Sequence, residues 1–207
     1  MTAFVIGLTG PMGAGKSTVG AMLRELGAKV LDADALVHDE QLRGTVGYSA
    51  IVQQFGTKVL GEDKEIDRTK LAAEVFGDPM KLQRLERILH PRVIARVLEA
   101  RSMLPDDAVL VVEAIKLLEG DLRKACDRIW VVVAPREAMI DRLAARGMRP
   151  REAELRLAQQ LSEDRFRAAA DTVIVNDRDR DRTRERVRDA WTELSRSRAR
   201  SSPGSGS

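Results

Sequence analysis

Residues 10–17 of this chain, Gly-Pro-Met-Gly-Ala-Gly-Lys-Ser, fit the pattern G-x-x-x-x-G-K-[ST] at every fixed position. The glycines of such a loop let successive backbone N–H groups turn toward the oxygens of a bound phosphate. Lys16 can then reach the β- and γ-phosphates of a nucleoside triphosphate, and the Ser17 hydroxyl can bind Mg²⁺. A helical pattern from Ser17 to Leu26 follows the loop, so a helix dipole adds to the anion site. The sequence therefore predicts binding of a nucleoside triphosphate together with Mg²⁺.

A second candidate for chemistry is Asp34, in the stretch Asp32-Ala33-Asp34 at the end of a short apolar run. Ligands of open parallel sheets collect beyond the carboxyl ends of the strands, so a carboxylate there can lie across the phosphates from the glycine-rich loop. It could accept the proton of an attacking hydroxyl or help to hold Mg²⁺. Asp34 also stands where the next helix begins, and a second interpretation is that its side chain only caps that helix.

The chain around these residues alternates short β-branched runs with helical patterns, which favours a parallel sheet flanked by helices. The runs at 109–112 and 129–133 are continuously apolar, as is typical of strands buried on both faces. We predict an α/β fold of the P-loop NTPase type, with three layers (α/β/α) around a five-stranded parallel sheet. The expected strands are Ala3–Thr9, Lys29–Asp32, Ala108–Glu113, Arg128–Ala134 and Thr172–Asn176.

Residues 35–104 contain no convincing strand and are expected to form a helical insertion that faces the substrate. Helices should begin at Asp67 and at Asp78, where the following proline suits the first helical turn. The pair His90-Pro91 should break or kink the long helical pattern that runs from residue 80 to residue 104.

Residues 135–170 are expected to form a lid, with helices at 135–145 and 151–170 on either side of a break at Gly147–Pro150. A last helix is expected at Asp181–Arg196, and the Ser/Gly/Arg-rich tail at 197–207 is expected to be disordered. The nucleotide-binding core would then consist of residues 1–34, 105–134 and 171–196.

Composition restricts the class of protein. A chain of 207 residues that is 43% hydrophobic fits one domain with insertions, and the net charge is only +3. The single cysteine excludes an internal disulfide and a cysteine-based zinc site, which favours a reducing cytoplasm. The N-terminus lacks the basic segment of a signal peptide, and no apolar run reaches about 18 residues, so we expect a cytoplasmic protein without a membrane partner. Nothing in the sequence indicates an oligomeric state.

The glycine-rich loop alone does not separate kinases from GTPases and transporter ATPases. A GTPase would need an Asn-Lys-x-Asp motif, whereas the single asparagine, Asn176, is followed by Asp177. A transporter ATPase would need Leu-Ser-Gly-Gly-Gln, and the nearest string is the Leu-Ser-Glu-Asp of residues 161–164. The small size, the helical insertion and the arginines of the lid favour a small-molecule kinase.

Several motifs, taken together, resemble the dephospho-coenzyme A kinase family. They run in order from residue 5 to about residue 178 and comprise residues 7–10 before the loop, residues 27–34, Leu89-His90-Pro91, and Gln160 to Asn176. The resemblance implies transfer of the γ-phosphoryl group of ATP to the 3′-hydroxyl of the ribose of dephospho-coenzyme A, the last step of coenzyme A synthesis. The implied partners are ATP and dephospho-coenzyme A, with Mg²⁺ as cofactor.

The resemblance also implies roles for residues. Asp34 matches the catalytic base, while Arg142 and Arg146 match lid arginines that meet the triphosphate beside Lys16. A plainer interpretation is open for both regions: His90 merely caps a helix that ends there, and Arg142 is merely a solvated surface residue. The implied ATP-binding residues are Gly10, Gly13, Ala14, Gly15, Lys16, Ser17, Thr18 and Asn176, and the implied acceptor-binding residues are Asp34, His90, Glu119 and Gln160. The stretch 113–119 departs from the family, because it lacks the usual proline and carries a lysine.

Three other functions stay open. A kinase for another small hydroxyl acceptor, such as a nucleoside monophosphate or a sugar acid, would share the loop and the base. An inactive nucleotide-sensing module would share the loop but would not need an intact Lys16, Ser17 and Asp34. The Arg-rich C-terminal half suggests a nucleic-acid-binding protein, but charges alternate in sign over residues 177–182, and aromatic residues make up only 3% of the chain. No nucleic-acid partner is therefore expected.

Overall fold

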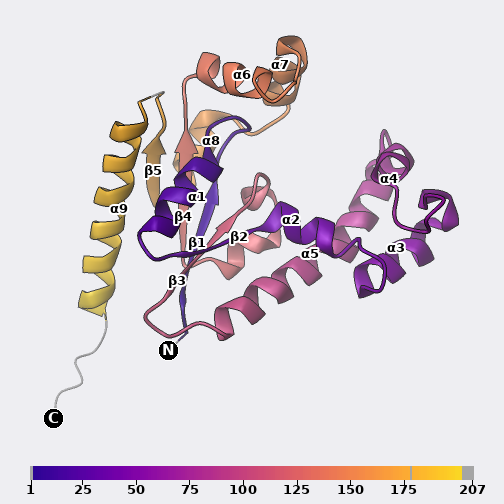
Figure 1. Ribbon diagram of the computed structural model, residues 1–207, viewed down its shortest axis with the longest axis horizontal. Coiled ribbons are helices and arrows are strands. Elements are labelled where there is room, and N and C mark those ends of the chain that lie inside the picture. Colours follow the sequence, from indigo (N-terminus) through magenta and orange to yellow (C-terminus); the bar gives the residue numbers. More distant parts are fainter. Residues whose placement is uncertain (1, 178, 202–207) are drawn as a thin grey trace.

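Five parallel strands form the centre of the protein (Figure 1). The structure is a computed structural model, and it describes residues 2–177 and 179–201. The strand order across the sheet is β2-β3-β1-β4-β5. The predicted five-stranded parallel sheet is confirmed, and each strand lies within one residue of its expected bounds. The strands are β1 (Phe4–Thr9), β2 (Lys29–Asp32), β3 (Val109–Glu113), β4 (Arg128–Val133) and β5 (Thr172–Val175).

Helices cover both faces of the sheet, and one group of them extends beyond it. Figure 1 shows α3 and α4 at the far end of the long helix α5, away from the strands, and α6 and α7 beyond one end of the sheet. The helices are α1 (Lys16–Glu25), α2 (Ala33–Asp39), α3 (Val46–Phe55), α4 (Arg68–Val75), α5 (Pro79–Ser102), α6 (Arg136–Ala144), α7 (Pro150–Ala158), α8 (Glu163–Ala168) and α9 (Arg180–Ser201), with short 3₁₀ segments at Thr57–Val59, Leu117–Glu119 and Asp121–Ala125.

Alternating side chains of each strand enter two separate cores. Val109 and Val111 of β3 pack with residues of α1 and α9, whereas Leu110 and Val112 pack with residues of α5 and α8. Both sets are apolar because both faces of a parallel sheet are covered by helices. This two-sided burial explains why the continuous apolar runs predicted the strands so closely.

The helical region at 35–104 has a small core of its own, where Ile51, Phe55 and Leu71 are buried with Leu89 of α5. Asp67 and Asp78 begin α4 and α5 as predicted, because each carboxylate accepts hydrogen bonds from backbone N–H groups two and three residues ahead. Between residues 35 and 104, all of which are described, the β-structure consists of one isolated bridge between Leu60 and Ile66.

Of the two outcomes predicted for His90-Pro91, the break is wrong, because α5 continues through Pro91 to Ser102, whereas the kink stays a prediction. Pro91 lacks an N–H and removes one hydrogen bond from the helix. Leu89, Val93 and Val97, on either side of this point, are buried, and their packing holds the helix together. His90 therefore lies inside the helix, and its interpretation as a cap at a helix end is wrong as well.

The single helix predicted at 151–170 is also wrong, because the chain divides there into α7 and α8. The Ser162 side chain caps α8 by accepting a hydrogen bond from the Arg165 N–H at 3.3 Å. α7 contributes Leu157 to the core on the α1 side of the sheet, whereas α8 contributes Phe166 to the core on the α5 side.

The last helix extends farther than expected. α9 reaches Ser201, so the prediction of disorder is wrong for residues 197–201, and its remaining part, residues 202–207, lies outside the described residues. The Arg198 guanidinium lies over the Phe4 ring at 5.2 Å from its centroid, which attaches this end of α9 to β1. Within the described part of the chain, no helix is long and apolar enough to cross a membrane.

Phe166 anchors the short helix α8 in the core, and its side chain is only 2% exposed. We expect Phe166→Ala to lower the free energy of unfolding by about 3–5 kcal/mol, because the substitution leaves a cavity. Phe76, which is 89% exposed, provides the same substitution at the surface and should change stability by less than about 0.5 kcal/mol. Urea unfolding of both variants measures the difference, and equal losses would show that Phe166 does not anchor α8.

Candidate active site

The glycine-rich loop connects β1 to α1 and has the backbone that its glycines allow. Gly10, Gly13 and Gly15 have positive φ angles of 144°, 79° and 98°, a region that side chains disfavour. The loop curls around the Lys16 ammonium, which donates hydrogen bonds to the carbonyl oxygens of Gly10 at 3.0 Å and Pro11 at 3.2 Å. Lys16 is buried, and this burial lowers the pKa of its ammonium, while the nearby carboxylates of Glu113 and Asp34 act in the opposite direction.

Two polar side chains support the outer side of the loop. The buried Asn176 donates from Nδ2 to the Ala14 carbonyl oxygen at 2.8 Å. The Arg142 guanidinium donates to the carbonyl oxygens of Gly13 at 3.2 Å, Ala14 at 3.1 Å and Asn176 at 3.1 Å. These two side chains therefore hold the carbonyl groups of Gly13 and Ala14, which are both among the predicted ATP-binding residues.

Arg146 is exposed and lies two residues beyond the end of α6. Its guanidinium is close enough to Lys16 to contribute to the lowered pKa of that ammonium. The structure thus brings the exposed Arg146 near Lys16, while Arg142 lies against the loop itself.

Asp32 rather than Asp34 caps α2. The Asp32 carboxylate accepts hydrogen bonds from the backbone N–H groups of Asp34 at 2.9 Å and Ala35 at 3.1 Å. The capping interpretation of Asp34 is therefore wrong, and its carboxylate is left for other interactions. Desolvation by the surrounding protein and the neighbouring Asp32 charge raise the pKa of Asp34, while Lys16 opposes this shift.

Glu113 belongs to the site although the sequence analysis did not include it. It ends β3, beside the end of β2 in the sheet, where it is paired with Asp32. Its carboxylate accepts a hydrogen bond from the Ser17 hydroxyl at 3.1 Å, and desolvation raises its pKa. The available signal was the one that identified Asp34, namely an acidic residue at the carboxyl end of an apolar strand.

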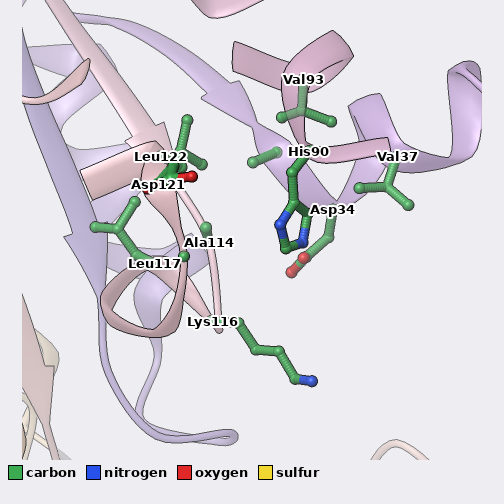
Figure 2. Close-up of a pocket in the computed structure, with 11 residues that line it drawn as sticks. Asp34, Val37, His90, Val93, Ala114, Lys116, Leu117, Asp121 and Leu122 are labelled. Carbon is green, nitrogen blue, oxygen red and sulfur yellow. The ribbon is translucent and has the colours of Figure 1, made fainter. Parts of the chain in front are cut away.

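A pocket opens next to Asp34, between α2, α5 and the segment that follows β3. Figure 2 shows the His90 ring and the Asp34 carboxylate side by side in this pocket, with the Lys116 side chain pointing away from both. The apolar walls of the pocket include Val37, Val93, Leu117 and Leu122. Asp34 and His90, two predicted acceptor-binding residues, are therefore brought together.

The other two predicted acceptor-binding residues lie elsewhere. Glu119 is exposed and is not among the residues that line the pocket, although Lys116, Leu117 and Gly120 around it are. Gln160 contacts the glycine-rich loop, where its Oε1 accepts a hydrogen bond from the Met12 N–H at 2.9 Å.

A second hollow lies at the same end of the sheet, on the β5 side of the glycine-rich loop, whereas the pocket at Asp34 lies on the β2 side. It is formed where α1 begins and where β5 ends, and Arg142 contributes to it from α6. Its lining residues are Ser17, Thr18, Ala21, Arg142, Asn176 and Arg180. The loop thus separates a pocket that contains a carboxylate from a hollow rich in polar donors.

The oxygen atoms around Ser17 fit a magnesium ion that binds together with a nucleotide. Mg²⁺ in such sites takes one or two protein oxygens and completes its shell with phosphate oxygens and water. The Ser17 hydroxyl and the Glu113 carboxylate provide two adjacent oxygens. Among residues 2–177 and 179–201, no three His, Cys, Asp or Glu side chains converge to hold a metal by themselves.

The chain is similar to known proteins over most of its length. The chain is 41% identical over 190 residues to a dephospho-CoA kinase of Streptomyces avermitilis, an alignment that covers 91% of this chain and 93% of the relative. A solved structure from Thermus thermophilus superposes with a TM-score of 0.83 at 32% identity and covers 94% of this chain and 98% of the other. A dephospho-CoA kinase structure from Campylobacter jejuni gives a TM-score of 0.60 at 25% identity and covers 93% and 97% of the two chains.

The sequence model that describes dephospho-CoA kinase matches residues 4–181, which contain all five strands, the glycine-rich loop and the pocket around Asp34. With more than half of the chain matched and these residues in place, this protein belongs to the dephospho-CoA kinase family.

Proposed function

We propose that this protein transfers the γ-phosphoryl group of ATP to the 3′-hydroxyl of the ribose of dephospho-coenzyme A. The observation that carries the proposal is the position of Asp34, whose carboxylate lines the pocket and also acts on the Lys16 ammonium of the glycine-rich loop. A hydroxyl held in the pocket would therefore lie between a carboxylate that can accept its proton and the site where the γ-phosphate binds.

In the proposed reaction the Asp34 carboxylate accepts the proton of the 3′-hydroxyl while the oxygen forms a bond to the γ-phosphorus. The bond between the γ-phosphorus and the bridging β,γ-oxygen breaks, and ADP leaves. Positioning and neutralisation of charge supply most of the acceleration in such transfers. Lys16 would hold the β- and γ-phosphates, and Arg146 would approach them from the open side. Mg²⁺, when bound at Ser17 and Glu113, supplies further positive charge at the phosphates.

The adenosine of ATP would occupy the hollow beside Ser17 and Thr18, where Asn176 and Arg142 hold the loop in shape. We further propose residues 135–170 as a lid over the nucleotide, with α8 as its fixed end because Phe166 is buried in the core.

Dephospho-coenzyme A would bind on the other side of the loop, with residues 35–104 as the acceptor-binding region. The apolar walls at Val37, Val93 and Leu122 suit the nucleoside of the acceptor, and Lys116 and His90 at the pocket suit its phosphates. The single cysteine and the use of ATP fit a cytoplasmic location.

Asp34→Asn removes the proton acceptor but keeps the shape of the side chain. We expect kcat to fall by about 100-fold or more, the usual range for a general base, with the affinity for ATP nearly unchanged. Because a carboxyl group with a raised pKa destabilises the folded state once it is ionised, this variant should unfold at a higher temperature at neutral pH. Steady-state kinetics and thermal unfolding measure both effects.

Asp39→Asn at the exposed end of α2 is the matched control and should keep full activity. Retention of wild-type kcat by the Asp34→Asn variant would show that Asp34 is not the base.

The raised pKa of Asp34 also predicts the pH dependence of kcat/KM. A protonated Asp34 cannot accept the proton of the hydroxyl, so activity should fall on acidification at a pH above 3.8, the ordinary pKa of an aspartic acid. On the alkaline side, kcat/KM should fall at a pH below 10.5, the ordinary pKa of a lysine, because burial lowers the pKa of the Lys16 ammonium that binds the phosphates. The residual rate of Asp34→Asn should lack the acid limb, whereas Glu113→Gln should keep it. An acid limb centred at or below 3.8 would contradict the assignment.

A further inference from the structure

The chain crosses the carboxyl edge of the sheet between α7 and α8, next to the glycine-rich loop. Leu157 of α7 packs in the core on the α1 side, whereas Leu161 packs against the core on the α5 side. Residues 158–160 therefore pass from one face of the sheet to the other. This crossing places the half-buried Gln160 within hydrogen-bond distance of the loop.

Gln160 forms a hydrogen bond with one peptide group of the loop, the group that joins Pro11 and Met12. The Met12 N–H donates to Gln160 Oε1 at 2.9 Å, and the carbonyl of the same peptide group belongs to Pro11. The Pro11 carbonyl oxygen accepts hydrogen bonds from the Lys16 ammonium at 3.2 Å and from the Ala14 N–H at 3.2 Å.

The two ends of this peptide group are rigidly coupled. No peptide bond in the described chain is cis, so the Pro11 carbonyl and the Met12 N–H point in opposite directions from one plane. An acceptor that holds the N–H outward therefore holds the carbonyl inward, toward Lys16. Rotation of this peptide plane would withdraw an acceptor from the buried ammonium and change the surface that the loop presents to phosphate.

The other supports of the loop lie at different groups. Arg142 and Asn176 bind the carbonyl oxygens of Gly13 and Ala14, farther along the loop. The Met12 side chain packs against the apolar core on the α1 side, which fixes the side chain but not the peptide plane. Among the hydrogen bonds of the described residues, the bond to Gln160 is the one that holds the Met12 N–H.

We infer that Gln160 is a positioning residue that orients the Pro11–Met12 peptide, and through it Lys16, for binding the phosphates of the nucleotide. The amide oxygen of Gln160 supplies the required acceptor. Gln160 thereby couples the junction of α7 and α8 to the phosphate loop. This inference rests on the nucleotide-binding half of the proposed function and is independent of the identity of the acceptor.

Gln160→Met tests the inference, because methionine has nearly the same length and lacks the amide oxygen. Gln160→Glu keeps an oxygen acceptor, and Gln159→Met makes the same change at the exposed neighbouring position. We expect Gln160→Met to weaken Mg·ADP binding by about 5-fold, the scale of one lost hydrogen bond, in calorimetric titrations of the full chain. Its Met12 amide should exchange with solvent about 10-fold faster, as followed by NMR in the unliganded protein.

The controls separate this role from a merely structural one. Gln160→Glu should keep the protection of the Met12 amide, and Gln159→Met should match the wild type in binding and exchange. Thermal unfolding of all variants shows whether they are folded. In steady-state kinetics, the KM for ATP should rise in Gln160→Met while the KM for the acceptor stays constant.

Three results would overturn the inference. The first is unchanged ADP binding and Met12 amide exchange in Gln160→Met. The second is a loss of Met12 amide protection in Gln160→Glu as large as that in Gln160→Met. The third is a change in Gln160→Met that is confined to the KM for the acceptor. If the wild type fails to phosphorylate dephospho-coenzyme A, the proposed acceptor is wrong. The ADP titrations and amide exchange still decide the role of Gln160.

Discussion

The buried ammonium of Lys16 is the constraint on which the other parts of the site depend. A charge removed from water is unfavourable unless nearby groups compensate it. The carbonyl oxygens of Gly10 and Pro11 accept its hydrogen bonds, and the carboxylates of Glu113 and Asp34 provide opposite charge. All of these groups lie at the carboxyl ends of β1, β2 and β3, so the order of strands in the sheet assembles the compensation. The same crowding desolvates the carboxylates of Asp34 and Glu113 and raises their pKa values.

Much of the fold follows from local sequence, and the errors occur where tertiary contacts decide. Strands β3 and β4 were predicted closely because both of their faces are apolar, and the caps Asp67 and Asp78 are encoded locally. Pro91 does not end α5, because buried side chains on either side keep the helix intact. The start of α8 was marked in the sequence by Ser162, which caps the helix. The helical pattern that runs across residues 151–170 nevertheless predicted one continuous helix. The extension of α9 depends on contacts of its C-terminal turns with the start of β1, which no sequence window contains.

The candidate site was predictable where a motif fixes the spacing of residues and less so where the fold brings segments together. The loop residues at 10–18 follow directly from the motif. The sequence could not decide between capping and chemistry for Asp34, because Asp32 is an equally suitable cap two residues earlier. Gln160 was associated with the acceptor, yet it contacts Met12, 148 positions earlier in the chain. Glu119 lies outside the pocket because the segment after β3 turns it toward solvent.

Under the proposed function the site phosphorylates one particular hydroxyl, so the decisive measurement is the identity of the product. Purified protein is incubated with Mg·ATP, with and without dephospho-coenzyme A, while ADP release is followed and the product is analysed by ³¹P NMR. The proposed function predicts ADP release that depends on dephospho-coenzyme A, in a one-to-one ratio with a new phosphate monoester on the ribose 3′-oxygen. ADP release independent of this acceptor, no release at all, or phosphate at another position would contradict it. Release that appears only with a nucleoside monophosphate or a sugar acid would assign the pocket to that acceptor.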